Sequence, residues 1–342
     1  MKAMQLEEVT DLTQTSTPLE PVSMPIPEPG PEQVLLKVHA CGVCHTELDE
    51  IEGRTPPPFF PVILGHQVVG TIEQCGPEVK SIAAGARVGV AWIFSSCGKC
   101  KYCLEGNDNL CDEFKATGRD ANGGYAQYMT VPSTSVFPIP ERFSDAEAAP
   151  LLCAGAIGYR SLKLTGLQNG QSLGLTGFGA SAHLVLKMAL FSYPDTPVFV
   201  FARSVKEREF AMELGAEWAG DTTDEPPGLL DCIIDTTPVW KPVVEALKCL
   251  NPGGRLIINA IRKEEIDKEV LLAMSYEKHL WMEKEIKSVA NVARSDVKEF
   301  LELAGEIPII PDYQEYELEE ANKALMELKQ RKIRGAKVLR IG

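Results

Sequence analysis

The chain has 342 residues, of which 44% are hydrophobic and 24% charged, as expected for a globular protein long enough for two domains. Its net charge of −14 excludes nucleic acid and anionic membranes as expected partners, because a phosphate-rich surface would repel it. Neither a secretory signal nor an apolar run of membrane-spanning length is visible, so we expect a cytoplasmic location in which the ten cysteines are reduced.

The first part of the chain, to about residue 140, has the pattern of a β-rich domain. Alternating or β-branched residues at 33–38 and 62–73 predict strands, and the prolines and glycines between them predict turns. We place this domain at residues 1–155.

Four cysteines within this domain are spaced for one tetrahedral metal ion. They follow the pattern C-x2-C-x2-C-x7-C inside a charged stretch, residues 95–113, that is too polar to build its own core. Zinc binds four thiolates in closed sites, and such an ion can hold a polar loop in shape. The pattern therefore predicts a structural zinc site, with disulfides or free thiols as the alternative. The predicted ligands are Cys97, Cys100, Cys103 and Cys111.

From residue 146 onward, helical and strand patterns alternate. Alanine- and leucine-rich residues at 146–164 predict a helix, and helical segments separate the strands expected at 172–176, 198–202, 231–235 and 255–260. This order is typical of a parallel, doubly wound sheet. We therefore predict an α/β protein with a nucleotide-binding domain at 156–290, and we expect residues 291–342 to return to the first domain.

A glycine-rich turn connects the first of these strands to a helix. Residues 177–182 are GFGASA, a G-x-G-x-x-A pattern. The first glycine allows a tight turn, the second admits a pyrophosphate, and the small third residue lets the helix pack on the strand. The start of the helix offers free N–H groups to phosphates. Gly177, Gly179 and Ala182 are therefore predicted to bind a dinucleotide.

The choice of dinucleotide depends on the end of the second strand. An NAD site usually has Asp or Glu there, whereas this chain has Arg203 and Ser204. A guanidinium and a hydroxyl suit a 2′-phosphate, and Lys206 and Arg208 add positive charge. NADP(H) is the predicted cofactor and NAD(H) the alternative. A solvated helix face is the other interpretation of these cations.

Together these features resemble the zinc-dependent alcohol dehydrogenases of the medium-chain dehydrogenase/reductase superfamily, over nearly the whole chain. The motifs stand in the family's order: CGVCHTE at 41–47, GHQVVG at 65–70, the four-cysteine stretch, GGYA at 123–126, LCAG at 152–155 and the glycine turn. The resemblance implies a GroES-like catalytic domain and a Rossmann domain, with cofactor and zinc in a cleft between them.

The resemblance also implies a second zinc ion, in an open catalytic site, so that two are expected per chain. Its ligands are Cys44, His66 and Cys153, and three nitrogen and sulfur ligands leave a fourth position for water or alcohol. Cys41, three residues before Cys44, is expected to be a small buried side chain.

Thr46 is implied as the hydroxyl that handles the alcohol proton, which relatives pass on to a histidine at the position of Asp49. A carboxyl group with a reference pKa of about 3.9 is a weak relay at neutral pH. Two interpretations stay open: Asp49 is a weaker relay, or it is a surface carboxylate beside an open water path.

The resemblance assigns four further positions. His45 matches a cation against the cofactor pyrophosphate and Glu47 an acid that orients the zinc-binding imidazole, with ordinary surface positions as the alternative for both. Trp92 and Thr55 are expected at the substrate, where threonine in place of a second tryptophan predicts a wider pocket. Core packing is the alternative for Trp92. Ile157 is expected against the nicotinamide, or else within its own helix.

Two positions depart from the family's pattern. Gln67 replaces the glutamate that relatives place after the ligand histidine, which removes one negative charge near the metal. Ala336 stands where many relatives have an arginine for the cofactor phosphates, and whether Lys337 replaces that arginine stays open.

The predicted function is the reversible, zinc-dependent oxidation of an alcohol, with a primary alcohol and its aldehyde as the expected pair. The alternatives are a polyol or specialised secondary-alcohol dehydrogenase of the same fold, and a non-catalytic nucleotide-binding relative. The open zinc site and Thr46 argue against a purely structural role. Relatives of this length are commonly oligomers, so a homotetramer or homodimer is expected.

Overall fold

The polypeptide forms two units in a computed structural model that describes residues 1–307, 309–330 and 335–342. Unit 1 comprises residues 1–153 together with 292–342, and unit 2 comprises residues 154–291. No helix of the described residues is long and apolar enough to span a membrane.

Unit 1 is built on a seven-stranded sheet in the order β10-β6-β5-β3-β18-β17, with β9 also paired to β3. The central strand β3 is buried along most of its length, because it has neighbours on both edges and apolar side chains on both faces. The strands are β3 (Gln33–Val43), β5 (Val68–Cys75), β6 (Arg87–Val90), β9 (Tyr128–Pro132), β10 (Phe137–Pro138), β17 (Tyr313–Glu317) and β18 (Ala336–Arg340). A smaller sheet, β2-β1-β4, contains β1 (Lys2–Leu6), β2 (Leu19–Ser23) and β4 (Val62–Ile63).

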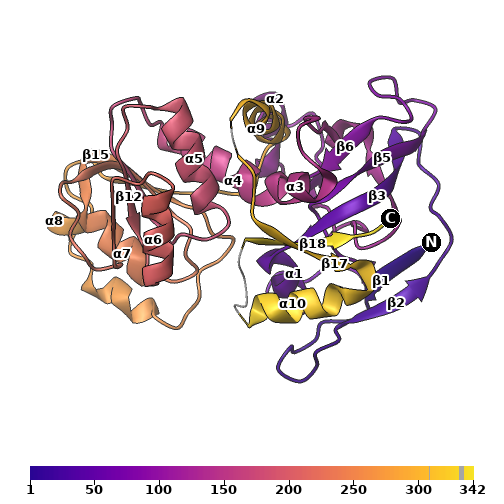
Figure 1. Cartoon of the computed structure of the whole chain (residues 1–342), viewed down its shortest axis with the longest axis horizontal. Coiled ribbons are helices and arrows are strands. Elements are labelled where there is room, and N and C mark those ends of the chain that lie inside the picture. Colours follow the sequence, from indigo (N-terminus) through magenta and orange to yellow (C-terminus); the bar gives the residue numbers. More distant parts are fainter. Residues whose placement is uncertain (308, 331–334) are drawn as a thin grey trace. The chain divides into compact units, whose positions relative to one another are not determined.

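The C-terminal segment lies among the N-terminal strands, as the yellow and indigo ribbons of unit 1 show (Figure 1). Strand β18 pairs antiparallel with β3, from Lys337 opposite Val43 to Arg340 opposite Ala40. Helix α10 (Ala321–Lys329) buries Leu325 in the same core. The two ends of the chain therefore build one hydrophobic core.

The helix predicted at 146–164 is not continuous. The structure has α3 (Asp145–Pro150), one π turn (Leu151–Gly155) and α4 (Ala156–Thr165). Pro150 has no N–H to donate to the preceding turn, so the regular ladder is already broken where the π turn begins. Such turns occur often at functional sites, and Cys153 lies in this one.

The strand predicted at 62–73 is also interrupted. Strand β4 ends at Ile63 and β5 begins at Val68, and the gap contains Gly65 with φ of +96°. A side chain is strained in this left-handed region, so glycine suits the bend. His66 follows it directly and leaves the regular strand pattern.

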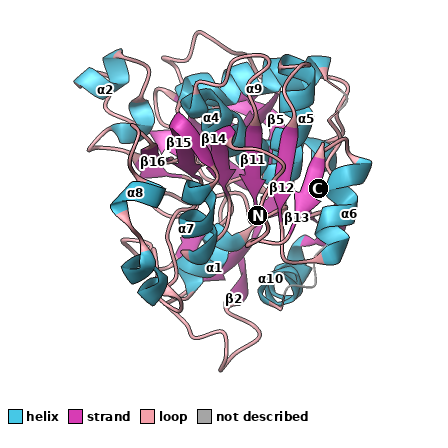
Figure 2. Cartoon of the chain, turned by 90° about the vertical axis from the view of Figure 1, so that its left-hand side faces the viewer, coloured by secondary structure: helices cyan, strands magenta, loops and turns pink. Residues whose placement is uncertain are grey.

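Unit 2 contains a six-stranded parallel sheet in the order β13-β12-β11-β14-β15-β16, which confirms the predicted doubly wound architecture. Helices α4 and α5 lie on one face of this sheet and α7 on the other (Figure 2). The order reverses between β11 and β14, where folds of this kind bind their ligands. The elements are β11 (Leu173–Thr176), α5 (Ala182–Ser192), β12 (Val198–Phe201), α6 (Val205–Glu213), β13 (Trp218–Gly220), β14 (Leu230–Asp235), α7 (Lys241–Lys248), β15 (Leu250–Ile258), α8 (Tyr276–His279) and β16 (Glu285–Ser288).

Apart from short 3-10 helices, the described residues of unit 1 form five further elements. Helix α1 (His45–Ile51) follows β3 directly and carries several of the predicted site residues. The others are β7 (Ile93–Ser95), α2 (Lys101–Leu104), β8 (Lys115–Ala116) and α9 (Arg294–Glu306).

Candidate metal centres and dinucleotide site

Three nitrogen and sulfur side chains converge in unit 1. Cys44 is the N-cap of α1, His66 lies in the gap between β4 and β5, and Cys153 lies in the π turn. Their ligand atoms all lie within 4.8 Å of one another, and Cys44 Sγ is 3.7 Å from His66 Nε2. A zinc ion bound to both atoms at its usual bond lengths would separate them by about 3.5 Å. These three residues, the open ligand group, therefore fit a metal ion.

Glu47 holds two members of the open ligand group in place. Its Oε2 accepts the backbone N–H of Cys44 at 2.8 Å, which closes a capping box at the start of α1. Its Oε1 lies 2.6 Å from Nδ1 of His66, so Nε2 is left to face Cys44. This is the tautomer that a metal-binding imidazole needs. Glu47 is fully buried, so its alternative assignment as a surface residue is wrong.

The buried carboxylate of Glu47 shifts the pKa values of two members of the open ligand group. A hydrogen bond with Cys153, burial and the charge of Glu47 raise the pKa of the Cys44 thiol well above its usual value. Burial lowers the pKa of His66, but the charges of Glu47 and Cys44 outweigh it and hold this pKa well above its usual value. Ligands in such surroundings gain from exchanging their protons for a divalent cation.

Other buried polar side chains lie around the open ligand group. The Trp92 ring meets the His66 ring edge-on, with centroids 6.5 Å apart. Gln67 is buried, and its Nε2 has no hydrogen-bond partner among the described residues. Glu50 is fully buried, and its pKa is raised well above the usual value by burial and then by the charge of Glu47. Sequence reasoning missed Glu50, although the i, i+3 spacing with Glu47 places both on one face of α1.

The predicted proton-handling and pocket residues follow Cys44 closely. Thr46 is half-buried, and its N–H donates to Cys44 Sγ at 3.4 Å. His45 is exposed on the first turn of α1. Thr55 is half-buried, and its N–H donates to the carbonyl of Asp49 at 3.1 Å. The structure therefore brings Thr46 next to the open ligand group.

Asp49 is not a surface carboxylate, so that interpretation is wrong. It is only 5% exposed, and its Oδ1 accepts a hydrogen bond from Nε of Arg54. The turn after α1 brings Arg54 back over the helix, because the N–H of Arg54 also donates to the carbonyl of Asp49 at 2.9 Å. Arg54 pairs with Glu52 as well, at 2.7 Å. A proton relay through Asp49 would have to compete with these ion pairs.

The four predicted cysteines of residues 95–113 also form one group. Cys103 Sγ lies 3.6 Å from Cys100 Sγ and 3.9 Å from Cys97 Sγ, and Cys111 completes the set. Four thiolates on one zinc ion are about 3.8 Å apart, whereas a disulfide bond is about 2.05 Å long. The disulfide alternative is therefore wrong. N–H groups of Lys99 and Cys100 lower the pKa of Cys97 to about 7, which favours a thiolate ligand.

The glycine turn of unit 2 leaves room for a phosphate. Gly177 has φ of +76°, and a Cβ atom there would lie 2.9 Å from Thr236 Oγ1. At Gly179 the position of a Cβ is open space, as close approach of a pyrophosphate requires. Ala182 is fully buried at the start of α5. Ile157 is half-buried in the first turn of α4.

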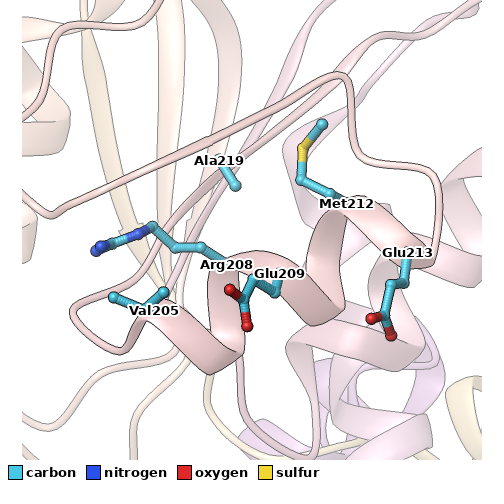
Figure 3. A pocket seen from close by; sticks show the side chains of 6 residues that line it. All are labelled: Val205, Arg208, Glu209, Met212, Glu213 and Ala219. Atoms are coloured by element: carbon cyan, nitrogen blue, oxygen red, sulfur yellow. The ribbon is translucent and has the colours of Figure 1, made fainter.

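The cationic side chains after β12 differ in whether they are free to bind a phosphate. Arg203 and Ser204 are exposed, and the Ser204 side chain does not cap α6. Arg208 is engaged instead, because its Nη1 donates to the carbonyls of Ala202 at 2.8 Å and Arg203 at 3.2 Å. A surface pocket beside Arg208 flanks α6 and β13 and includes neither the glycine turn nor Ser204 (Figure 3); it is lined by Val205, Arg208, Glu209, Met212, Glu213 and Ala219.

Lys337 is engaged inside unit 1. Its buried Nζ donates to Tyr316 OH at 2.5 Å and to Glu327 Oε2 at 2.8 Å. These partners hold the ammonium group in the core, so the structure does not support Lys337 as a phosphate ligand.

Comparisons with known proteins agree with one another. Residues 30–141 match the alcohol dehydrogenase GroES-like domain. A probable alcohol dehydrogenase, AdhA, of Mycobacterium tuberculosis is 43% identical over 329 residues, which cover 95% of this chain and 93% of that protein. An alcohol dehydrogenase of Geobacillus stearothermophilus is 33% identical over 322 residues, with 90% and 91% covered. The structure of a cinnamyl alcohol dehydrogenase of Sorghum bicolor superposes with a TM-score of 0.82 at 26% identity, over 99% of this chain and 97% of that one.

Proposed function

The chain belongs to the zinc-type medium-chain alcohol dehydrogenases, and we propose that it interconverts primary alcohols and aldehydes with NADP(H). The observation that carries the proposal is the convergence of Cys44, His66 and Cys153, with Glu47 behind the imidazole. Three ligands suit a reactive metal and four suit a structural one, so we propose one zinc ion at each group.

Each residue around the open ligand group has a distinct role in the proposed reaction. Zinc bound there supplies Lewis-acid polarisation of the substrate oxygen, and the dinucleotide supplies the hydride carrier. The Thr46 hydroxyl, beside Cys44, receives the alcohol proton during oxidation while it passes its own proton on towards the cofactor ribose and solvent, and the transfer runs in reverse during reduction. Glu47 keeps the imidazole of His66 oriented from behind. The buried side chain of Trp92 limits the access of water to one side of the open ligand group.

Metal analysis and an initial-rate screen test the proposal together. We expect about two zinc ions per chain, and turnover of primary alcohols and aldehydes in preference to polyols and secondary alcohols. Because Thr55 is smaller than a tryptophan, branched and aromatic substrates belong in the screen. A single zinc ion per chain without turnover would instead favour the non-catalytic alternative, and a preference for polyols would favour the polyol dehydrogenase.

Asp49→Asn is expected to leave the pH profile of kcat unchanged, because the Asp49 carboxylate is committed to Arg54. The variant should lose about 1 to 2 kcal/mol of stability with the ion pair, which thermal unfolding measures. Thr46→Val is the contrasting variant: it should lower kcat by about 10²-fold or more, and Thr46→Ser should retain the hydroxyl function. A shifted pH profile in Asp49→Asn would restore Asp49 as the relay.

The exposed Arg203 and the uncommitted Ser204 hydroxyl support NADP(H) as the cofactor. Arg203→Ala should therefore lower the ratio of kcat/KM for NADP(H) to that for NAD(H) by about 10- to 100-fold, as the loss of charge-assisted hydrogen bonds predicts. Lys248→Ala is the control, because it removes a partly exposed cation of the same unit from α7. An unchanged ratio in Arg203→Ala, or a wild-type preference for NAD(H), contradicts this choice of cofactor.

The proposed homo-oligomer is supported by the last strand of the unit 2 sheet. All four residues of β16 are exposed, and an unpaired strand edge is a template for another strand. Large apolar side chains are exposed within residues 261–286, with Leu272 90% exposed, and such surfaces favour association. They are Ile261, Ile266, Leu272, Tyr276, Leu280, Trp281, Met282 and Ile286. Light scattering should give at least twice the chain mass of 37.4 kDa.

A further inference from the structure

A buried ion pair lies at the carboxyl edge of the parallel sheet in unit 2. Asp235 is the last residue of β14 and is fully buried, and the Lys263 side chain, beyond the end of β15, is only 7% exposed. The Lys263 ammonium donates to Asp235 Oδ2, to the carbonyl of Thr237 at 2.7 Å and to the carbonyl of Val239 at 3.0 Å. Its three N–H donors therefore all have acceptors.

The second oxygen of Asp235 extends this ion pair to the neighbouring strand. Oδ1 accepts from Thr176 Oγ1 at 2.6 Å and from Thr237 Oγ1 at 2.7 Å. Thr176 ends β11, directly before Gly177. We call Thr176, Asp235, Thr237 and Lys263 the Asp235 cluster. It ties the ends of β11 and β14 to the segment that follows β15.

The Asp235 cluster borders the reversal point of the strand order. Strands β11 and β14 are the adjacent pair at which the order reverses, and a dinucleotide lies across such a crevice. Arg203, which follows β12, is the proposed contact of the adenosine 2′-phosphate, so we assign the adenosine to that half of the sheet. The segment 259–263 follows β15 in the opposite half, which leaves the nicotinamide to that side.

The segment 259–263 is held at both of its ends. The N–H of Asn259 donates to the Asp235 carbonyl at 2.7 Å, and the Asn259 amide lies 3.4 Å from Ser181 Oγ, at the start of α5. Lys263 fastens the other end to the Asp235 carboxylate. The segment thus runs along the crevice between two fixed points.

We propose that Lys263 and Asp235 are positioning residues that hold the segment 259–263 in the shape needed to receive the nicotinamide half of the dinucleotide. This inference rests on the proposed dinucleotide function. A buried ion pair often adds little to stability in comparison with apolar side chains of the same size. Removing one partner leaves the other charge buried and unpaired, which lowers stability, but the effect specific to positioning should appear in the geometry of binding, where misplacement by about 1 Å can cost about 10²-fold.

Two binding titrations on the full-length protein separate positioning from general damage. NADPH and NADH report on the whole dinucleotide through nicotinamide fluorescence, and ADP and 2′,5′-ADP report on the adenosine half through calorimetry. In Lys263→Met we expect the Kd for the dinucleotides to rise about 10- to 100-fold, while the Kd for the adenosine fragments stays within about two-fold. Asp235→Asn should show the same split, and Lys263→Arg should recover part of the dinucleotide affinity.

Lys268→Met is the matched control, because Lys268 lies close by in sequence but is exposed and pairs only with Glu265 among the described residues. It should leave every Kd unchanged. Lys263→Gln keeps a hydrogen-bond donor and replaces Lys263→Met if that variant does not fold. A dinucleotide Kd that is unchanged, or that rises in step with the fragment Kd, overturns the positioning role. Wild-type protein that binds neither dinucleotide instead contradicts the proposed function.

Discussion

Replacing Cys153 with serine should lower kcat/KM for alcohol oxidation by at least about 10³-fold, because the reaction depends on an electrophilic metal at this position. Serine cannot supply a thiolate, so the open ligand group keeps only Cys44 and His66. The zinc content should fall from about two ions per chain to about one. The fold should persist, because Cys153 is half-buried in the π turn rather than packed in the core.

Cys41→Ser is the matched control for this variant. Cys41 lies three residues before Cys44 and is buried, but its thiol donates to the Gly42 carbonyl and does not belong to the open ligand group. Its replacement should keep both zinc ions and most of the activity. Full activity in Cys153→Ser, or the loss of one zinc ion in Cys41→Ser, would show that the ligands have been assigned wrongly. Unchanged NADPH affinity in Cys153→Ser would localise the defect to the metal.

Replacing Cys103 with serine should destabilise the protein far more than it changes the chemical step. Binding of structural zinc contributes about 10 to 16 kcal/mol to the folding free energy of isolated zinc-finger peptides. The loss of folding free energy in Cys103→Ser should be smaller, because other contacts hold the segment 95–113. Strands β7 and β8 pair at its base, and Arg294 donates to Asp108 at 2.5 Å and to Ser96 at 2.8 Å. We expect a fall in Tm on the order of 10 °C and proteolytic cleavage within residues 95–113.

Measurements on Cys103→Ser below its Tm test the separation of the two metal sites. The zinc content should fall to about one ion per chain, and kcat should stay within a few-fold of the wild-type value. Cys249→Ser is the control, because Cys249 is half-buried and belongs to neither ligand group. An unchanged Tm and zinc content in Cys103→Ser would contradict the structural role of the four cysteines.

The predicted helix at 146–164 and the predicted strand at 62–73 are both interrupted in the structure, and each interruption contains a candidate metal ligand. An alanine- and leucine-rich run predicts one helix at 146–164, but a π turn interrupts it at Cys153. Alternating or β-branched residues predict one strand at 62–73, but the strand is interrupted around His66. Residue patterns report burial, and both segments remain largely buried through the interruption. Periodicity alone therefore could not show where the backbone leaves its regular geometry.

Side-chain partners were the least predictable part of the site. Asp49 and Arg54 are only five residues apart, yet the sequence leaves open whether Asp49 is a relay or a surface carboxylate and does not predict this ion pair, because only the turn after α1 folds the guanidinium back over the helix. The sequence does not show whether Lys337 binds the cofactor phosphates, whereas the structure shows that Tyr316 and Glu327 bind its ammonium group in the core. A buried charge needs partners whatever element supplies them, and the spacing of residues does not name distant partners.

The sequence by itself determined the fold class, the four-cysteine group, the glycine turn and the identity of the three residues that converge in unit 1. The first three features depend on local spacing, because a strand, a turn or a chelating loop involves residues close together along the chain. Cys44, His66 and Cys153 lie far apart in the sequence, and they are identified by the resemblance of their motifs to those of the family. Only the tertiary structure decided the π turn at Cys153, the pairing of Asp49 with Arg54 and the tie between Lys263 and Asp235. Those contacts depend on which segments pack together and on which charges packing takes out of water. The packing of segments and the burial of charges depend on the whole fold, so they cannot be predicted from a short stretch of sequence.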